Sequence, residues 1–78
     1  MRAYILIQTG AGRLAGVVRD ISRIRGVRSA QGVTGAYDVI ALAEAPSLSA
    51  LADRVLADIA SLGGVTRAIT CPVPGAAS

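Results

Sequence analysis

Hydrophobic and polar positions along the first third of the chain show two different periods. Residues 2–9 alternate and are rich in large apolar side chains, which predicts a β-strand. From Arg13 the apolar residues recur every three or four positions, which predicts an amphipathic helix that Gly26 ends. The apolar stripe of this helix consists of Leu14, Val17, Val18, Ile21 and Ile24.

The middle of the chain predicts a β-hairpin. Residues 27–34 form a second, more polar strand, and residues 37–43 form a third strand that is apolar on both faces. Gly35-Ala36 lies between them as a candidate turn.

The last third repeats the helix and strand of the first. Pro46 ends the third strand, and Ser47 is placed to cap a second helix that Gly63-Gly64 ends. Residues 65–73 form the last strand, and residues 74–78 read as a loose tail. The apolar stripe of the second helix consists of Leu48, Leu51, Val55, Ile59 and Leu62.

The element order is β-α-β-β-α-β, and its two halves show a short internal repeat, because both helices end on the pattern I-[SA]-x-[IL]-x-G-V. Two similar β-α-β halves predict the ferredoxin-like fold of the α+β class, a four-stranded antiparallel sheet with two helices on one face. Right-handed crossovers place the first and third strands side by side in the centre. We expect one domain over residues 1–73.

Both faces of the two central strands are apolar, although two helices can cover only one face of the sheet. Ile5 and Ile7 point to one side of the first strand, and Tyr4 and Leu6 to the other. Val39 and Ala41 likewise oppose Ile40 and Leu42 in the third strand. A large uncovered apolar patch is unusual on a monomer, so we expect dimerisation through the sheet.

Length and composition agree with this expectation. The chain has 78 residues, of which 53% are apolar, and so small a domain has too little interior to bury them all. No apolar run approaches the roughly 20 residues that cross a bilayer. The net charge of +3 comes from eight scattered arginines, and we interpret the cluster over residues 19–28 as a solvated helix face rather than a nucleic-acid footprint.

The residue inventory argues against catalysis, metal binding and a cofactor. The chain has no His, Lys or Asn, and its one cysteine, Cys71, lacks a second thiol or an activating base. Gly10-Ala11-Gly12 links a strand to a helix but lacks the remaining residues of a nucleotide-binding loop. We therefore expect no catalytic residues and no metal ligands, with Cys71 as an ordinary strand residue.

The hairpin between the second and third strands is the best candidate for a site. On spacing alone, Gly35 can supply a positive φ angle and Asp38 can simply cap the turn. Alternatively, glycine lets a ligand approach backbone N–H groups that bind a carboxylate, while Asp38 accepts hydrogen bonds from an ammonium group. The second interpretation describes recognition of a free amino acid.

Four stretches of the sequence resemble the effector-binding domain of the Lrp/AsnC (feast/famine) regulators, also called the RAM domain. The most specific is the G-x-Y-D hairpin at residues 35–38, which an apolar strand follows. The resemblance covers about residues 2–73. In that family the domain follows a helix-turn-helix DNA-binding domain, which these residues do not include, so the chain resembles the stand-alone form and no direct DNA binding is expected. The other stretches are Ala3-Tyr4-Ile5-Leu6-Ile7, Ile24-Arg25-Gly26-Val27 and Leu62-Gly63-Gly64-Val65.

The resemblance implies a cytoplasmic, non-enzymatic module that modulates transcription of amino-acid metabolism. In the family, domains pair through their sheets, dimers assemble further, and amino-acid effectors bind between dimers; full-length Lrp/AsnC regulators are the implied partners. Two alternatives stay open, which are a small dimeric ferredoxin-like barrel enzyme, of the monooxygenase or isomerase type, and a ligand-free oligomerisation domain. The ligand-binding positions that match the family are Gly35, Ala36, Tyr37, Asp38 and Thr70.

Overall fold

The helices and strands follow the predicted order. The computed structural model describes residues 1–74, and the predicted tail lies outside these residues except for Pro74. The second helical segment is continuous but is built from three parts, with a π-helix in the middle. The elements are β1 (Arg2–Thr9), α1 (Leu14–Ser22), β2 (Val27–Gly32), β3 (Val39–Glu44), α2 (Leu48–Ala50), η1 (Leu51–Leu56), α3 (Ala57–Ala60) and β4 (Val65–Pro72).

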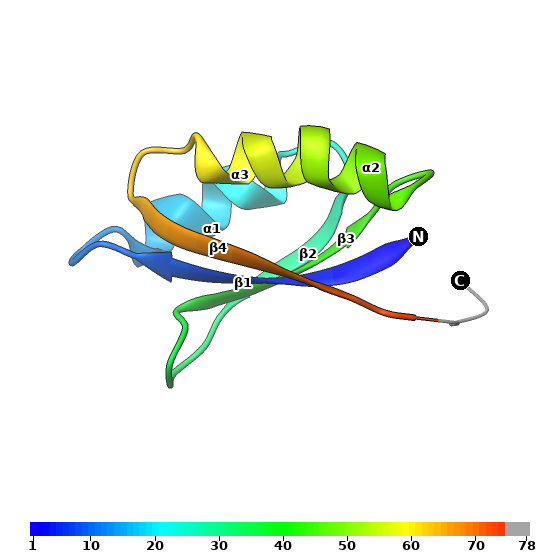
Figure 1. Ribbon diagram of the computed structural model, residues 1–78. Helices are drawn as coiled ribbons and strands as arrows, with labels where there is room; N and C mark the ends of the chain where they lie inside the picture. Colours follow the sequence, from blue (N-terminus) through cyan, green and yellow to red (C-terminus); the bar gives the residue numbers. More distant parts are fainter. Residues whose placement is uncertain (75–78) are drawn as a thin grey trace.

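The four strands form one antiparallel sheet in the order β2-β3-β1-β4. Both helical segments lie on the same face of this sheet, and the other face is bare (Figure 1). Strands β1 and β3 are neighbours in the centre, with Ile5 opposite Ala41 and Ile7 opposite Val39. The predicted α+β ferredoxin-like architecture is therefore confirmed.

The core lies between the helices and the central strands. Alternate residues of β1 and β3 point toward the helices, as the pattern predicts, and meet the stripe of each helix. The first residue of each predicted stripe is an exception, because Leu14 and Leu48 remain 41% and 47% exposed. The buried core consists of Ala3, Ile5, Ile7, Val17, Ile21, Val39, Ala41, Ala43, Leu51, Val55 and Ile59.

The helices differ from the prediction in their details. Helix α1 ends at Ser22, before Gly26, because the chain tightens there into turns in which Ile24 N donates to Ile21 O. Ser47 caps the second helical segment as predicted, since its Oγ accepts from Ala50 N at 3.0 Å. Among residues 1–74, no helix is both long and apolar enough to cross a membrane.

Candidate functional site: the hairpin between β2 and β3

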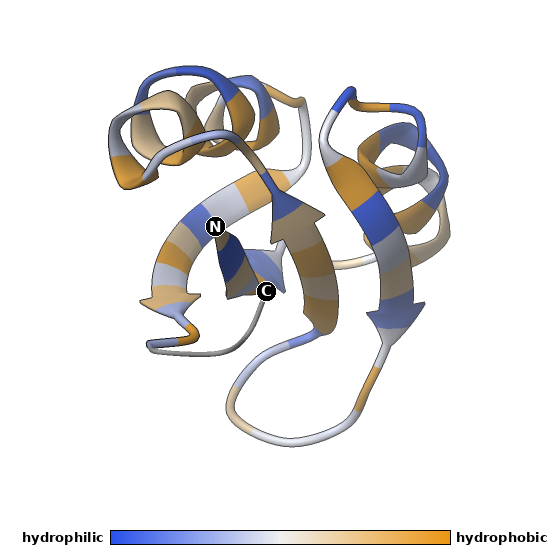
Figure 2. Cartoon of the chain, turned by 90° about the vertical axis from the view of Figure 1, so that its right-hand side faces the viewer, coloured by the Kyte–Doolittle hydropathy of each residue, from blue (hydrophilic) through white to orange (hydrophobic). Residues whose placement is uncertain are grey.

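The hairpin loop at residues 33–38 is longer than the predicted two-residue turn. Strand β2 ends at Gly32 and β3 begins at Val39, and Val33 N donates to Asp38 O at 2.8 Å across the loop. The loop projects from the end of the sheet, on the side away from the helices (Figures 1 and 2). It is therefore open to a ligand or to another subunit.

Gly35 stands at the tip of this loop in a conformation that favours glycine. Its φ angle is +133°, and a Cβ built there would meet nothing within 4 Å. Gly35 and Ala36 are exposed, whereas Tyr37 and Asp38 are half-buried at the base. The space beside Gly35 leaves its backbone accessible.

Asp38 fastens the base of the loop to the end of β1. Its Oδ2 accepts a hydrogen bond from Thr9 N at 2.8 Å, and its backbone N donates to Ile7 O at 2.9 Å. The register between β1 and β4 shifts at Gln8/Thr9, so the carboxylate meets the chain at an irregular point of the strand. Asp38 thus holds the loop against β1 instead of capping its own turn, and Oδ1 accepts no hydrogen bond within the described part of the chain.

Gln8 supplies a second attachment of the same loop to β1. Its Nε2 donates to Ala36 O at 3.0 Å. Together with the Asp38 contacts, this bond fixes the loop from both its middle and its base. Sequence reasoning missed Gln8 and Thr9, because both lie in a strand far from the hairpin in the sequence and neither is unusual in type.

Thr70 is not brought together with the hairpin residues within one subunit. It pairs with Ile5 across β1 and β4, and directly opposed residues share a face of the sheet, so it points toward the helices. From the spacing of residues and strands, Thr70 is separated from Asp38 by roughly 10 Å along the strand direction and by roughly 10 Å across the sheet. Its Oγ1 is buried and has no hydrogen-bond partner among residues 1–74. Any site that contains both Asp38 and Thr70 would have to use two subunits.

The bare face of the sheet carries an apolar patch, which we call the open face. Tyr4 is 47% exposed there and Cys71, which pairs with it across β1 and β4, is also exposed. The cross-strand register places four further apolar residues on the same side. The open face consists of Tyr4, Leu6, Ile40, Leu42, Ile69 and Cys71.

A small ion-pair network borders the open face at the end opposite the hairpin. Glu44 Oε2 contacts Arg2 Nε at 2.6 Å, and Glu44 Oε1 contacts Arg28 Nη1 at 3.0 Å. The hydrogen bond from Arg2 and the positive charges of Arg28 and Arg2 lower the pKa of Glu44 below its ordinary value of 4.5. These charges tie β1, β2 and β3 together at the rim.

The described residues include groups that can bind other molecules. Between Met1 and Pro74, no group of three or more His, Cys, Asp or Glu side chains is arranged to hold a metal ion. The hairpin offers exposed backbone and one carboxylate oxygen, and the open face offers apolar surface. These features suit recognition of a small polar molecule and of another protein surface.

Comparison with known proteins identifies the family. Residues 2–74 match the family model of the Lrp/AsnC ligand binding domain. The chain therefore belongs to this family of regulatory ligand-binding domains, as the hairpin motif predicted. A search of the curated proteins found no match.

Solved structures from three organisms have the same fold. TTHA0845 from Thermus thermophilus is 33% identical over 88% of this chain and 86% of that chain, with a TM-score of 0.81. The hypothetical protein PHS023 from Pyrococcus horikoshii is 28% identical over 88% and 83%, with a TM-score of 0.79. AsnC of E. coli is 19% identical over 94% of this chain and 50% of that chain, with a TM-score of 0.84. The last likeness is one of fold alone, and this chain spans about half the length of AsnC.

Proposed function

We propose that this chain is an amino-acid sensor that assembles with copies of itself and modulates the transcription of amino-acid metabolism genes. It acts without catalysis, in the cytoplasm, by binding a free amino acid and by associating with full-length regulators of its family. The observation that carries the proposal is the Asp38 carboxylate, which has one oxygen bound to Thr9 N and one without a hydrogen bond among residues 1–74, beside the open backbone of Gly35.

The two ends of an amino acid fit the two kinds of group at the hairpin. The ligand carboxylate accepts hydrogen bonds from backbone N–H groups near Gly35 and Ala36, where no side chain obstructs approach. The ligand ammonium group donates to Asp38 Oδ1, which gives a charge-assisted bond. Since the loop is fixed to β1, little ordering of the protein accompanies binding.

The assembly uses the open face. Two copies that pair face to face cover Tyr4 and its apolar neighbours. At about 25 cal/mol per Å², the free energy gained by burying this apolar surface outweighs a modest association cost. The hairpin projects on the same side of the sheet, so its residues lie near the boundary of such a dimer (Figure 1). Further association of dimers closes the site against β4 of a neighbouring subunit. Thr70 of that strand takes part only if the contact uncovers its hydroxyl, which is buried in the single chain.

A thermal-shift screen of the twenty amino acids tests the proposal. We expect at least one amino acid to raise the melting temperature, because a ligand that binds only the native state stabilises it. No shift with any of them would contradict the sensing role and would favour the ligand-free assembly domain.

Calorimetry on three variants then tests the residues. Asp38→Asn keeps an oxygen for Thr9 N but removes the charge, so it should lose binding and keep the fold; Asp38→Ala should lose binding and keep the dimer. Unchanged affinity in Asp38→Asn would remove the carboxylate from the site. Thr70→Val tests whether Thr70 of a neighbouring subunit belongs to the site, and an unchanged affinity for the amino acid would exclude it. Since the Thr70 hydroxyl is buried and unpaired among residues 1–74, this variant should be at least as stable as the parent.

A further inference from the structure

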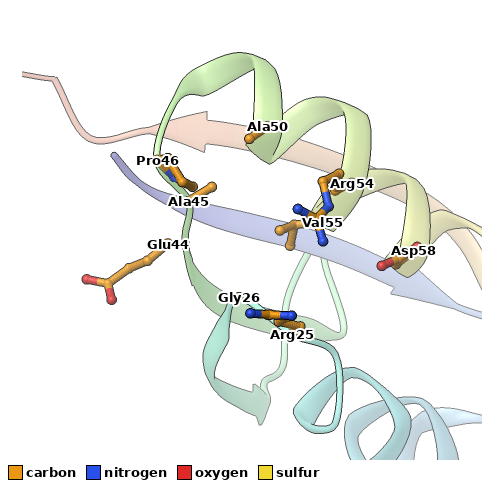
Figure 3. Close-up of a pocket in the computed structure, with 9 residues that line it drawn as sticks. All are labelled: Arg25, Gly26, Glu44, Ala45, Pro46, Ala50, Arg54, Val55 and Asp58. Atoms are coloured by element: carbon orange, nitrogen blue, oxygen red, sulfur yellow. The ribbon is translucent and has the colours of Figure 1, made fainter.

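A cavity lies at the opposite end of the sheet from the hairpin. It has a volume of about 370 Å³, within the range of small-molecule pockets. Its walls are the turn at residues 25–26, the chain at residues 44–46 and the side of the second helical segment that carries Ala50, Arg54, Val55 and Asp58 (Figure 3). We call it the arginine pocket.

Two guanidinium groups line this pocket from different elements. Arg54 comes from η1, and Arg25 comes from the turn before β2, on the other side of the cavity (Figure 3). Neither forms an ion pair within residues 1–74. Guanidinium groups bind carboxylates and phosphates through paired N–H donors, so two of them around one cavity form a receptor for an anion.

The acidic residues of the pocket leave it positively charged. Both oxygens of Glu44 are occupied by Arg2 and Arg28, so Glu44 does not compete for the pocket arginines. Asp58 is the remaining acid, and its single negative charge opposes the two positive charges of Arg25 and Arg54. The net charge of these three groups matches a ligand with one negative charge better than a ligand with two.

The pocket is held in shape by a close contact between its walls. Glu44 N donates to Gly26 O at 2.7 Å, and a Cβ at residue 26 would lie 2.9 Å from Val55 Cγ2. Glycine is therefore required where the turn approaches the helix. The apolar part of the lining, from Ala45, Pro46, Ala50 and Val55, gives hydrocarbon a surface to pack against.

The geometry points to a second ligand site in this pocket, for a small carboxylate with one negative charge and a short apolar group. The carboxylate lies between Arg25 and Arg54, and the apolar group packs on Val55 and Ala50. This site stands apart from the hairpin and does not depend on the proposed amino-acid site.

An NMR titration of the ¹⁵N-labelled chain at constant ionic strength tests the second site. With isobutyrate as the probe, the amide signals of Gly26 and Val55 should shift and saturate. Inorganic phosphate, which carries more negative charge at neutral pH, should bind more weakly. Linear shifts that never saturate, or tighter binding of phosphate than of isobutyrate, would overturn the assignment.

Matched variants connect the shifts to the two arginines. Arg54→Gln and Arg25→Gln should each weaken isobutyrate binding at least tenfold, because each leaves one guanidinium. Arg19→Gln removes an exposed arginine of α1 outside the pocket and should leave the binding curve unchanged. An equal loss in Arg19→Gln would indicate general surface charge and contradict the site. The signals of Gly35 and Asp38 report amino-acid binding separately, so either site can fail alone.

Discussion

Truncation of Tyr4 on the open face should separate the subunits of the proposed dimer without unfolding them. Tyr4 lies in central strand β1 and is 47% exposed in the single chain. Leu48, the first residue of α2, has the same exposed fraction but lies in the helical layer. The pair Tyr4→Ala and Leu48→Ala therefore removes a comparable exposed apolar group from two different surfaces.

The size of the effect follows from the exposed area of Tyr4. An aromatic side chain buries roughly 150–250 Å², so the exposed fraction leaves roughly 100 Å² for the partner to cover. At about 25 cal/mol per Å², this area contributes about 2.5 kcal/mol per copy. Because both copies of a symmetric dimer change, the total is about 5 kcal/mol, and the dissociation constant should rise by between about three and about four orders of magnitude in Tyr4→Ala.

Sedimentation velocity over a wide concentration series measures this constant. A dye at the N-terminus allows nanomolar samples and avoids Cys71, which lies on the face under test. Leu48→Ala should dissociate as the parent does. A Tyr4→Ala dimer that dissociates no more readily than the parent, or a Leu48→Ala dimer that is weakened as much, would show that the open face is not the interface.

Three further predictions concern the stability of the fold. In Asp38→Ala the Thr9 N–H loses a charge-assisted partner, so unfolding in urea should require about 1–2 kcal/mol less free energy, whereas Asp38→Asn should stay close to the parent. The pKa of Glu44 is lowered in the folded state, so its carboxylate stabilises the fold above its unfolded pKa, and this stabilisation is lost as the pH falls through the folded pKa. On acidification, the melting temperature of Glu44→Gln should therefore fall less than that of the parent. Gly26→Ala should cost more than about 1 kcal/mol and more than Gly12→Ala, because both glycines have positive φ but only Gly26 meets neighbouring atoms.

Each of these predictions has a contradicting result. Equal stability of Asp38→Ala and the parent would mean that the bond to Thr9 contributes nothing. If the melting temperatures of Glu44→Gln and the parent fell in parallel with pH, the ion-pair network would not contribute to the loss of stability in acid. If Gly26→Ala and Gly12→Ala lowered the free energy of unfolding equally, the Val55 side chain would have to move away from the new Cβ at residue 26 at no cost.

The elements and the two faces of the sheet could be predicted because burial determines the period of the pattern. Ile5 and Ile7 face the helices and Tyr4 and Leu6 face away, as alternation required. The same patterning does not reveal a π-helix, since Leu51 and Val55 are buried in either kind of helix. Leu48 shows a related limit, because a helix can carry its apolar stripe past the edge of the core.

The site was predicted less completely than the fold because its contacts join distant parts of the chain. Asp38 bonds to Thr9, 29 positions earlier, and the donor is a backbone group that any residue except proline provides. Arg25 and Arg54 line one cavity although they belong to different halves of the chain, and only the packing of helix against turn brings them together. The family could be recognised from the sequence because each of the four stretches that resemble it is contiguous, and the match of residues 2–74 confirms this resemblance.

The mass of the unmodified chain in solution tests the central claim that the open face is an interface between copies. Light scattering on material eluting at micromolar concentration gives this mass without a shape assumption. We expect a mass of at least twice the 7.8 kDa of one chain. A stable species of 7.8 kDa, with Tyr4 and its neighbours left in water, would contradict it.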